Sequence, residues 1–255
     1  HAKNLNKVDL RKLAILNFLN IWEEMGISPM LSLEDIERYS PRTPGVAEEM
    51  LACYIEARWS ILQSCNLLAV EQPFAVPLPN IPDVWYVGRL DKVIEYNGQT
   101  LVIEHKTTTE YKIDGGFRQT YLESWDSDSQ VKGYEFGAGD YFGADQVWID
   151  AALVHKKVHD KFRFIPVAHQ KPLLSEWIAG TEDWVIRVKH DLERNYFPKN
   201  ENSCMGKYGP CSFLDICRGV PKPEELTEPP FGYLYQPWSP FETLDLQQLI
   251  DGAKI

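Results

Sequence analysis

The sequence of 255 residues lacks the features that mark several classes of protein. It contains no run of about 18 apolar residues, so it predicts no transmembrane helix. Its first stretch, HAKNLNKVDLRK, is polar and basic and lacks the apolar region of a secretory signal. No internal repeat or low-complexity tract is visible. We therefore expect an ordinary globular chain, long enough for one large domain or two small ones.

An excess of positive charge is also missing. The formal net charge is -11, which argues against a protein that coats polyanions without specificity. It does not exclude an enzyme that acts on nucleic acid, because metal-binding carboxylates and a local basic groove can coexist with an acidic whole.

Cysteine is scarce, and its number is odd. Five cysteines form a poor disulfide framework, and three of them lie close together near the C-terminal end of the sequence. A reducing compartment with a metal or cluster site is the better interpretation. We expect a cytoplasmic protein with no membrane partner.

The pattern of apolar residues predicts alternating helices and strands. A polar loop is expected over residues 32–45, with Thr43 capping the helix that follows and Pro44 in its first turn. The order of elements predicts a mixed α/β domain with a central sheet. Helices are expected over residues 8–25, 45–68, 128–142 and 172–195, and strands over 68–78, 84–96, 100–108, 145–157 and 161–169.

Asn97-Gly98 between two β-rich runs is a strong hairpin signal. If it is a two-residue turn, Asp91 lies directly opposite Glu104, with Cβ atoms about 4.5–5.5 Å apart. Side chains alternate along a strand, so Lys106 shares the face of Glu104. The turn therefore predicts two carboxylates and one ammonium on the same face.

Two carboxylates at this distance repel each other. A shared divalent cation would remove the repulsion, and hard cations such as Mg²⁺ prefer carboxylate oxygens. A metal ion acidifies a bound water, and a neighbouring ammonium stabilises charge on a phosphate. The alternative is a solvated face on which Lys106 forms a salt bridge with Glu104 or Asp91.

Four stretches then resemble the PD-(D/E)XK nuclease superfamily in its RecB-like branch. GRLD at residues 88–91 and EHK at 104–106 correspond to its acidic and E-x-K motifs. The threonines after the lysine are common in that branch, and QVKGY at 130–134 fits its Q-x-x-x-Y motif. The fourth stretch is GVAEE at 45–49, where the family often has G-x-x-x-H. The resemblance covers roughly residues 43–220.

The GVAEE stretch departs from the family pattern because Glu49 occupies the position of the histidine. Some phage-type relatives use glutamate there. Either Glu48 or Glu49 can be the metal ligand on this helix, and we favour Glu49.

The resemblance implies a metal-dependent hydrolysis of phosphodiester bonds. Glu49, Asp91, Glu104 and the main-chain carbonyl of Ile103 would hold one or two Mg²⁺ or Mn²⁺ ions. Lys106 would position the nucleophile or stabilise the phosphate.

The same resemblance gives Gln130 and Tyr134 the role of holding the DNA strand or Lys106 in register. Without it, they would be a polar residue of a helix surface and a core aromatic. Four basic residues are further candidates for contacts with DNA phosphates, although a solvated strand end explains them equally well: Lys156, Lys157, Lys161 and Arg163.

Cys204, Cys211 and Cys217 resemble the C-terminal part of the iron–sulfur motif of CRISPR-adaptation and AddB-like nucleases. There, an early cysteine completes a [4Fe-4S] cluster with three late ones. In this sequence the first interval is longer, and no cysteine precedes the GVAEE stretch. Cys53 or Cys65 would replace the early cysteine as the fourth ligand, or the fourth ligand belongs to N-terminal residues that are missing from the given sequence. Structural zinc is a second option and three free thiols are a third.

We therefore expect an α/β, restriction-endonuclease-like core with a central mixed β-sheet flanked by helices. The expected division is an N-terminal helical region (1–42), the nuclease core (43–200), and a cysteine-containing segment with a tail packed on the core (201–255). The expected function is a metal-dependent deoxyribonuclease, an exonuclease of recombination, repair or phage type that acts on DNA ends or single strands. The alternatives are an inactive nuclease-fold protein that binds DNA or a partner, and a structural iron–sulfur or zinc protein.

Overall fold

The computed structural model describes residues 5–26, 28, 30–109, 116–155, 161–206, 209–237 and 239. The helices of this part are α1 (Lys7–Glu24), α2 (Leu33–Tyr39), α3 (Pro44–Ser64), α4 (Gln119–Glu123), α5 (Ser129–Phe142), α6 (Lys171–Glu193) and α7 (Leu214–Gly219), with 3-10 turns at Ser124–Ser127, Glu201–Ser203 and Pro223–Glu225. The strands are β1 (Asn66–Pro77), β2 (Trp85–Tyr96), β3 (Gln99–Thr108), β4 (Val147–Leu153), β5 (Phe162–Val167), β6 (Met205–Gly206) and β7 (Gly209–Pro210).

A five-stranded sheet in the order β1-β2-β3-β4-β5 forms the centre of the fold. β3 and β4 are parallel and are connected through α5, whereas the other neighbouring strands are antiparallel. This is a mixed α/β sheet, as the order of elements predicted, and it is consistent with a restriction-endonuclease-like core.

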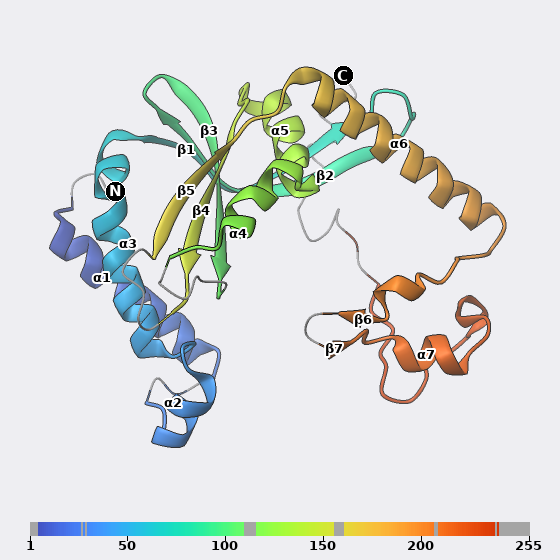
Figure 1. Ribbon diagram of the computed structural model, residues 1–255, viewed down its shortest axis with the longest axis horizontal. Coiled ribbons are helices and arrows are strands. Elements are labelled where there is room, and N and C mark those ends of the chain that lie inside the picture. The colour runs from blue at the N-terminus through green and yellow to red at the C-terminus, as the bar shows by residue number, and fades with distance from the viewer. Residues whose placement is uncertain are drawn as a thin grey trace.

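Helices cover both faces of the sheet, with α3 on one side and α4 and α5 on the other (Figure 1). The larger core lies on the α5 side and includes Phe74, Leu90, Val131 and Ile149. A smaller core of Ile94, Leu101 and Ile103 lies on the opposite face, where Ile61 of α3 packs against it. α1 packs on α3.

The turn between β2 and β3 has the conformation that the sequence predicted. Asn97 and Gly98 have φ angles of 52° and 76°, the left-handed values of a type I′ turn. The ladder pairs Val93 with Val102, which confirms the predicted register. The positions of Asp91 and Glu104 on neighbouring strands follow from this register.

Three details of the predicted elements differ from the structure. The helix expected over residues 45–68 ends at Ser64, because Asn66 and Leu67 pair with β2 instead. The loop expected over 32–45 contains α2, whose first turn is capped by the Ser32 hydroxyl. The short helix α4 and the 3-10 turn after it were not expected ahead of α5.

The described part of the cysteine segment lies beyond the far end of α6, away from the five-stranded sheet (Figure 1). The 23-residue helix α6 carries the chain away from the sheet before β6 begins. The packing of residues 201–255 on the core stays a prediction. The boundary at residue 200 stays a prediction.

Among the described residues, no helix is both long enough and apolar enough to cross a membrane.

Candidate active site

Strands β2 and β3 and helix α5 bring five of the predicted site residues together: Asp91, Glu104, Lys106, Gln130 and Tyr134. The hairpin register places Asp91 beside Glu104, and strand alternation adds Lys106 on the same face. α5 begins at Ser129, where the side chain of Asp128 accepts hydrogen bonds from the first backbone amides. The next side chain along the helix, Gln130, reaches Lys106 and Glu104.

Glu104 is buried, with 3% of its surface exposed. Its Oε1 atom lies 2.5 Å from the Nζ atom of Lys106 and 3.3 Å from the amide nitrogen of Gln130. Its Oε2 atom is also buried but has no hydrogen-bond partner among the described residues. A buried carboxylate oxygen without a partner is costly, so this atom is a position where a ligand would gain binding energy.

The environment shifts the pKa of Glu104 upward, from 4.5 to about 7. Burial is the largest cause. The hydrogen bond and charge of Lys106 lower the pKa, and the nearby carboxylate of Asp91 raises it again. The carboxylate is thus held in a place that disfavours its negative charge unless a further cation approaches.

Gln130 connects the ammonium of Lys106 with the hydroxyl of Tyr134. Its Oε1 atom accepts a hydrogen bond from Lys106 at 2.9 Å, and its amide nitrogen donates to Tyr134 at 2.7 Å. Burial, followed by the charge of Glu104, raises the pKa of the Tyr134 hydroxyl, which therefore stays protonated. The chain Tyr134–Gln130–Lys106 holds the ammonium over the carboxylate.

Asp91 is half-buried, and its Oδ2 atom accepts a hydrogen bond of 2.9 Å from the backbone N–H of His105. This bond ties β2 to β3 just beyond the paired residues of the ladder. Ile103 is a buried residue of β3 that pairs with Lys92 of β2, and its carbonyl as a metal ligand stays a prediction.

The structure does not bring Glu49 to these carboxylates. Its exposed Oε1 atom pairs with Nζ of Lys161 at 2.6 Å, and Lys161 is 7% exposed. Glu48 is half-buried on the same helix. Within the described ranges, no group of three or more His, Cys, Asp or Glu side chains is arranged to hold a metal ion.

The four basic residues predicted to contact DNA phosphates differ in their exposure. Lys161 is buried and forms an ion pair with Glu49, whereas Arg163 on β5 is exposed. Lys156 and Lys157 lie outside the described residues.

Cys204, Cys211 and Cys217 line a common cavity of about 660 Å³ beside α7. Cys53 and Cys65 belong to α3 and its C-terminal cap, on the other side of the sheet from this segment (Figure 1). In this arrangement neither can serve as the fourth ligand, because a [4Fe-4S] cluster needs all four thiolates in one place. The three late cysteines line one cavity, but within the described residues they are not arranged to hold a metal ion, and the iron–sulfur or zinc site stays a prediction.

The sequence analysis missed a buried polar network on the opposite face of the sheet. Asp150 of β4 is 2% exposed and accepts hydrogen bonds from Arg58 at 2.8 and 3.0 Å and from the Tyr54 hydroxyl at 2.6 Å. The Nδ1 atom of His105 lies 3.4 Å from the same carboxylate. An aspartate inside the apolar run VWIDAAL was the available signal, since a buried charge requires partners.

Comparisons with known proteins give distant structural likeness only. No protein-family model matches the chain, and no curated protein matches it in sequence. A candidate exonuclease from Eubacterium rectale aligns over 91% of this chain and 79% of its own, with a TM-score of 0.43 and 13% identity. A protein called SSO0001 aligns over 68% and 70%, with a TM-score of 0.32 and 14% identity. The function is therefore inferred from the side chains of the site.

Proposed function

We propose that this protein is a metal-dependent deoxyribonuclease that hydrolyses phosphodiester bonds, an exonuclease of recombination, repair or phage type that acts on DNA ends or single strands. The observation that carries the proposal is the buried Oε2 atom of Glu104, which has no hydrogen-bond partner in the described part of the chain and lies in a site shared with Asp91 and Lys106. The resemblance of the surrounding motifs to the PD-(D/E)XK superfamily supports the same conclusion.

The residues present fit a hard divalent cation. Asp91 and Glu104 offer carboxylate oxygens, which Mg²⁺ and Mn²⁺ prefer, and the raised pKa of Glu104 reflects a site that needs more positive charge. The carbonyl of Ile103 is a further candidate ligand, and Glu49 would have to leave Lys161 to join them. When bound, such an ion supplies Lewis-acid polarisation of a phosphate and an acidified water as the nucleophile.

The protein's own side chains then supply orientation and charge. Lys106 offers a fixed ammonium to a phosphate that becomes more negative during hydrolysis, and such preorganised charge stabilises the transition state. Gln130 fixes the direction of that ammonium, and Tyr134 fixes the amide of Gln130. Lys106 is thus the proposed catalytic residue, and the other two are positioning residues.

The test is cleavage of end-labelled DNA with Mg²⁺ or Mn²⁺, compared with EDTA. We expect loss of activity in Lys106→Ala and unchanged activity in Lys12→Ala, which removes an exposed lysine of α1. Equal cleavage by both variants, or no cleavage by the wild type with either metal, would contradict the proposal. Resistance of circular DNA would identify the exonuclease form.

A second candidate is a nuclease-fold protein that binds DNA or a partner without cutting. One observation favours it: Glu49 pairs with Lys161 and not with the two carboxylates. In that case, the wild type binds DNA in the presence of Mg²⁺ and leaves it intact.

A further inference from the structure

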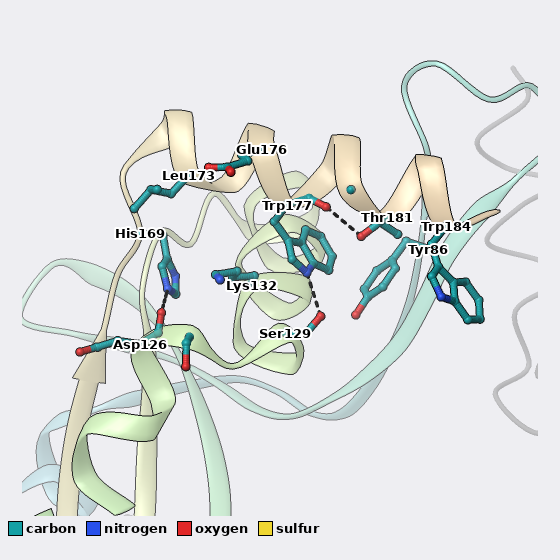
Figure 2. A pocket seen from close by; sticks show the side chains of 12 residues that line it. Tyr86, Asp126, Ser129, Lys132, His169, Leu173, Glu176, Trp177, Thr181 and Trp184 are labelled. Atoms are coloured by element: carbon teal, nitrogen blue, oxygen red, sulfur yellow. Dashed lines mark hydrogen bonds between the residues drawn. The ribbon is translucent and has the colours of Figure 1, made fainter. Parts of the chain in front are cut away.

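A groove between α5 and α6 lies outside the carboxylate cluster and has no role in the chemistry described above (Figure 2). Its volume is about 720 Å³. Aromatic rings and one lysine dominate its wall, and the residues that matter most are Tyr86, Ser129, Lys132, Trp177, Gly180 and Trp184.

The indole of Trp177 is held in a fixed position. Its N–H donates a hydrogen bond of 2.8 Å to the hydroxyl of Ser129, and its ring packs edge-on against Tyr86 with centroids 5.2 Å apart at 85°. A ring that is already ordered loses little conformational entropy when a flat ligand stacks on it.

Trp177, Gly180 and Trp184 follow one face of α6 at helical spacing. Seven residues of helix separate the two tryptophans by ~10.5 Å along the axis. Gly180 lies between them, and a Cβ atom added there would meet no atom within 4 Å. Trp184 is 67% exposed. The two indoles thus border an open space, an arrangement that suits stacked planar groups better than a packed core.

The groove also contains charged side chains, one lysine (Lys132) and the carboxylates of Asp126 and Glu176. Lys132 is half-buried, extends into the groove in Figure 2, and forms no ion pair within the described part of the chain. His169 forms the wall near it: its Nε2 atom bonds the carbonyl of Asp126 at 2.7 Å, and its Nδ1 atom bonds Glu135 at 3.0 Å. Both ring nitrogens are occupied, so His169 is part of the structure of the wall.

The groove and the carboxylate cluster share the start of α5. Gln130 turns toward Lys106 and Glu104, whereas Ser129 and Lys132 border the groove. A strand bound at both sites would pass the first turns of α5.

We propose that this groove binds a single-stranded part of the DNA substrate, with bases stacked on Trp177 and Trp184 and a backbone phosphate beside Lys132. This inference rests on the proposed nuclease function and specifies which form of DNA it acts on. Aromatic rings combined with a basic side chain are the usual means of binding single strands without sequence preference. The exposed carboxylates of Asp126 and Glu176 in the groove lining oppose the phosphate, so stacking supplies most of the affinity.

Binding is measured in EDTA, where no cleavage interferes, with a labelled oligothymidylate of about 20 nucleotides, long enough to exceed a typical single-strand site. Trp184→Ala should weaken binding about 5-fold or more, as expected for the loss of one stacked base. Gly180→Leu should weaken it as well by filling the space between the indoles. Phe231→Ala, which removes a fully exposed aromatic that does not line the groove, is the matched control and should bind like the wild type.

Charge and stacking are separated by two further measurements. An abasic strand of the same length keeps the phosphates but lacks the bases, so it should bind weakly and should not respond to Trp184→Ala. Lys132→Gln should reduce the slope of log affinity against log salt by about 0.7, the value for one phosphate contact on a single strand. Glu176→Gln should tighten binding.

Equal affinity of the wild type, Trp184→Ala and Gly180→Leu for the oligothymidylate would overturn the proposal, as would equal affinity for the abasic strand or for a blunt duplex. These outcomes differ from failure of the nuclease proposal. Cleavage with Mg²⁺ or Mn²⁺ but without Trp184-dependent binding contradicts the groove alone. Trp184-dependent binding without cleavage contradicts the nuclease alone.

Discussion

The ammonium of Lys106 on β3 donates a hydrogen bond of 2.9 Å to the side-chain oxygen of Gln130 on α5. The two residues are 24 positions apart in the sequence. The bond holds the lysine at Oε1 of Glu104. The other oxygen, Oε2, has no hydrogen-bond partner among the described residues.

Removing this bond should slow catalysis without removing the catalytic group. We expect Gln130→Ala to lower kcat about 10-fold or more, because Lys106 is free to adopt other rotamers, and to change KM little. Gln130→Glu, which keeps an acceptor for the lysine, should recover part of the rate. An unchanged kcat in Gln130→Ala would show that Lys106 needs no positioning. The measurement is steady-state cleavage of labelled DNA at saturating metal.

The raised pKa of Glu104 predicts how stability depends on pH in EDTA. Its folded-state pKa of about 7 lies above its ordinary value of 4.5, so the neutral acid is favoured in the fold. The stability it contributes is present below pH 4.5 and is lost as the pH rises through 7. Since one pKa unit corresponds to about 1.4 kcal/mol, Glu104→Gln should be more stable than the wild type at pH 8 by up to about 3 kcal/mol. Urea unfolding at pH 5 and pH 8 measures this, and a less stable variant at pH 8 would refute it.

A divalent cation should stabilise the folded protein through the same carboxylates. Adding Mn²⁺ at about 100 times its Kd should increase the free energy of unfolding by about 3 kcal/mol and raise Tm accordingly. Asp91→Asn should lose most of this effect. Asp183→Asn, which changes an exposed aspartate of α6, should retain it. Thermal unfolding with and without Mn²⁺ tests this, and an equal increase in all three proteins would place the ion elsewhere.

The buried pair of Arg58 and Asp150 should contribute strongly to stability. Asp150→Asn leaves the guanidinium buried without its counter-ion, so we expect a loss of about 3–5 kcal/mol at pH 7. Asp183→Asn breaks the exposed pair with Arg187 and should cost less than about 1 kcal/mol. Burial alone would raise the pKa of Asp150, but hydrogen bonds from His105, Tyr54 and Arg58 lower it below 3.8. The difference between wild type and Asp150→Asn in urea unfolding should therefore shrink only as the pH falls below that value.

Gly137 of α5 should not tolerate a side chain. A Cβ atom there would lie 2.4 Å from the ring of Phe74, which is completely buried. We expect Gly137→Ala to destabilise the protein by about 1–3 kcal/mol, as overpacking does in a filled core. Gly45→Ala in the first turn of α3 meets no neighbour within 4 Å and should be neutral or slightly stabilising. Similar unfolding midpoints for the two variants would mean that Phe74 can move.

Much of the carboxylate cluster could be predicted from the sequence, because it depends on local geometry. The Asn97-Gly98 turn sets the register of β2 and β3, and alternation then places Glu104 and Lys106 on one face. The mixed sheet followed from the order of the elements. The start of α5 was predictable to within one residue, which placed Gln130 and Tyr134 on its first turns.

Other contacts depend on which distant elements pack together, and no local pattern contains that information. Glu49 lies 112 positions from its partner Lys161, and Arg58 lies 92 positions from Asp150. The end of α3 was misplaced because the pairing of Asn66 with Glu95 outweighs helical periodicity at that point.

The sequence by itself determined the turn, the strand register and therefore the meeting of Asp91, Glu104 and Lys106, since all three follow from the backbone within one hairpin. Only the tertiary structure decided that Gln130 accepts a hydrogen bond from Lys106 and that Lys161 forms an ion pair with Glu49. It also decided that α5 and α6 enclose an aromatic groove. These outcomes depend on how the helices pack against the sheet. The burial and shape of side chains that are far apart in the sequence select one packing among many.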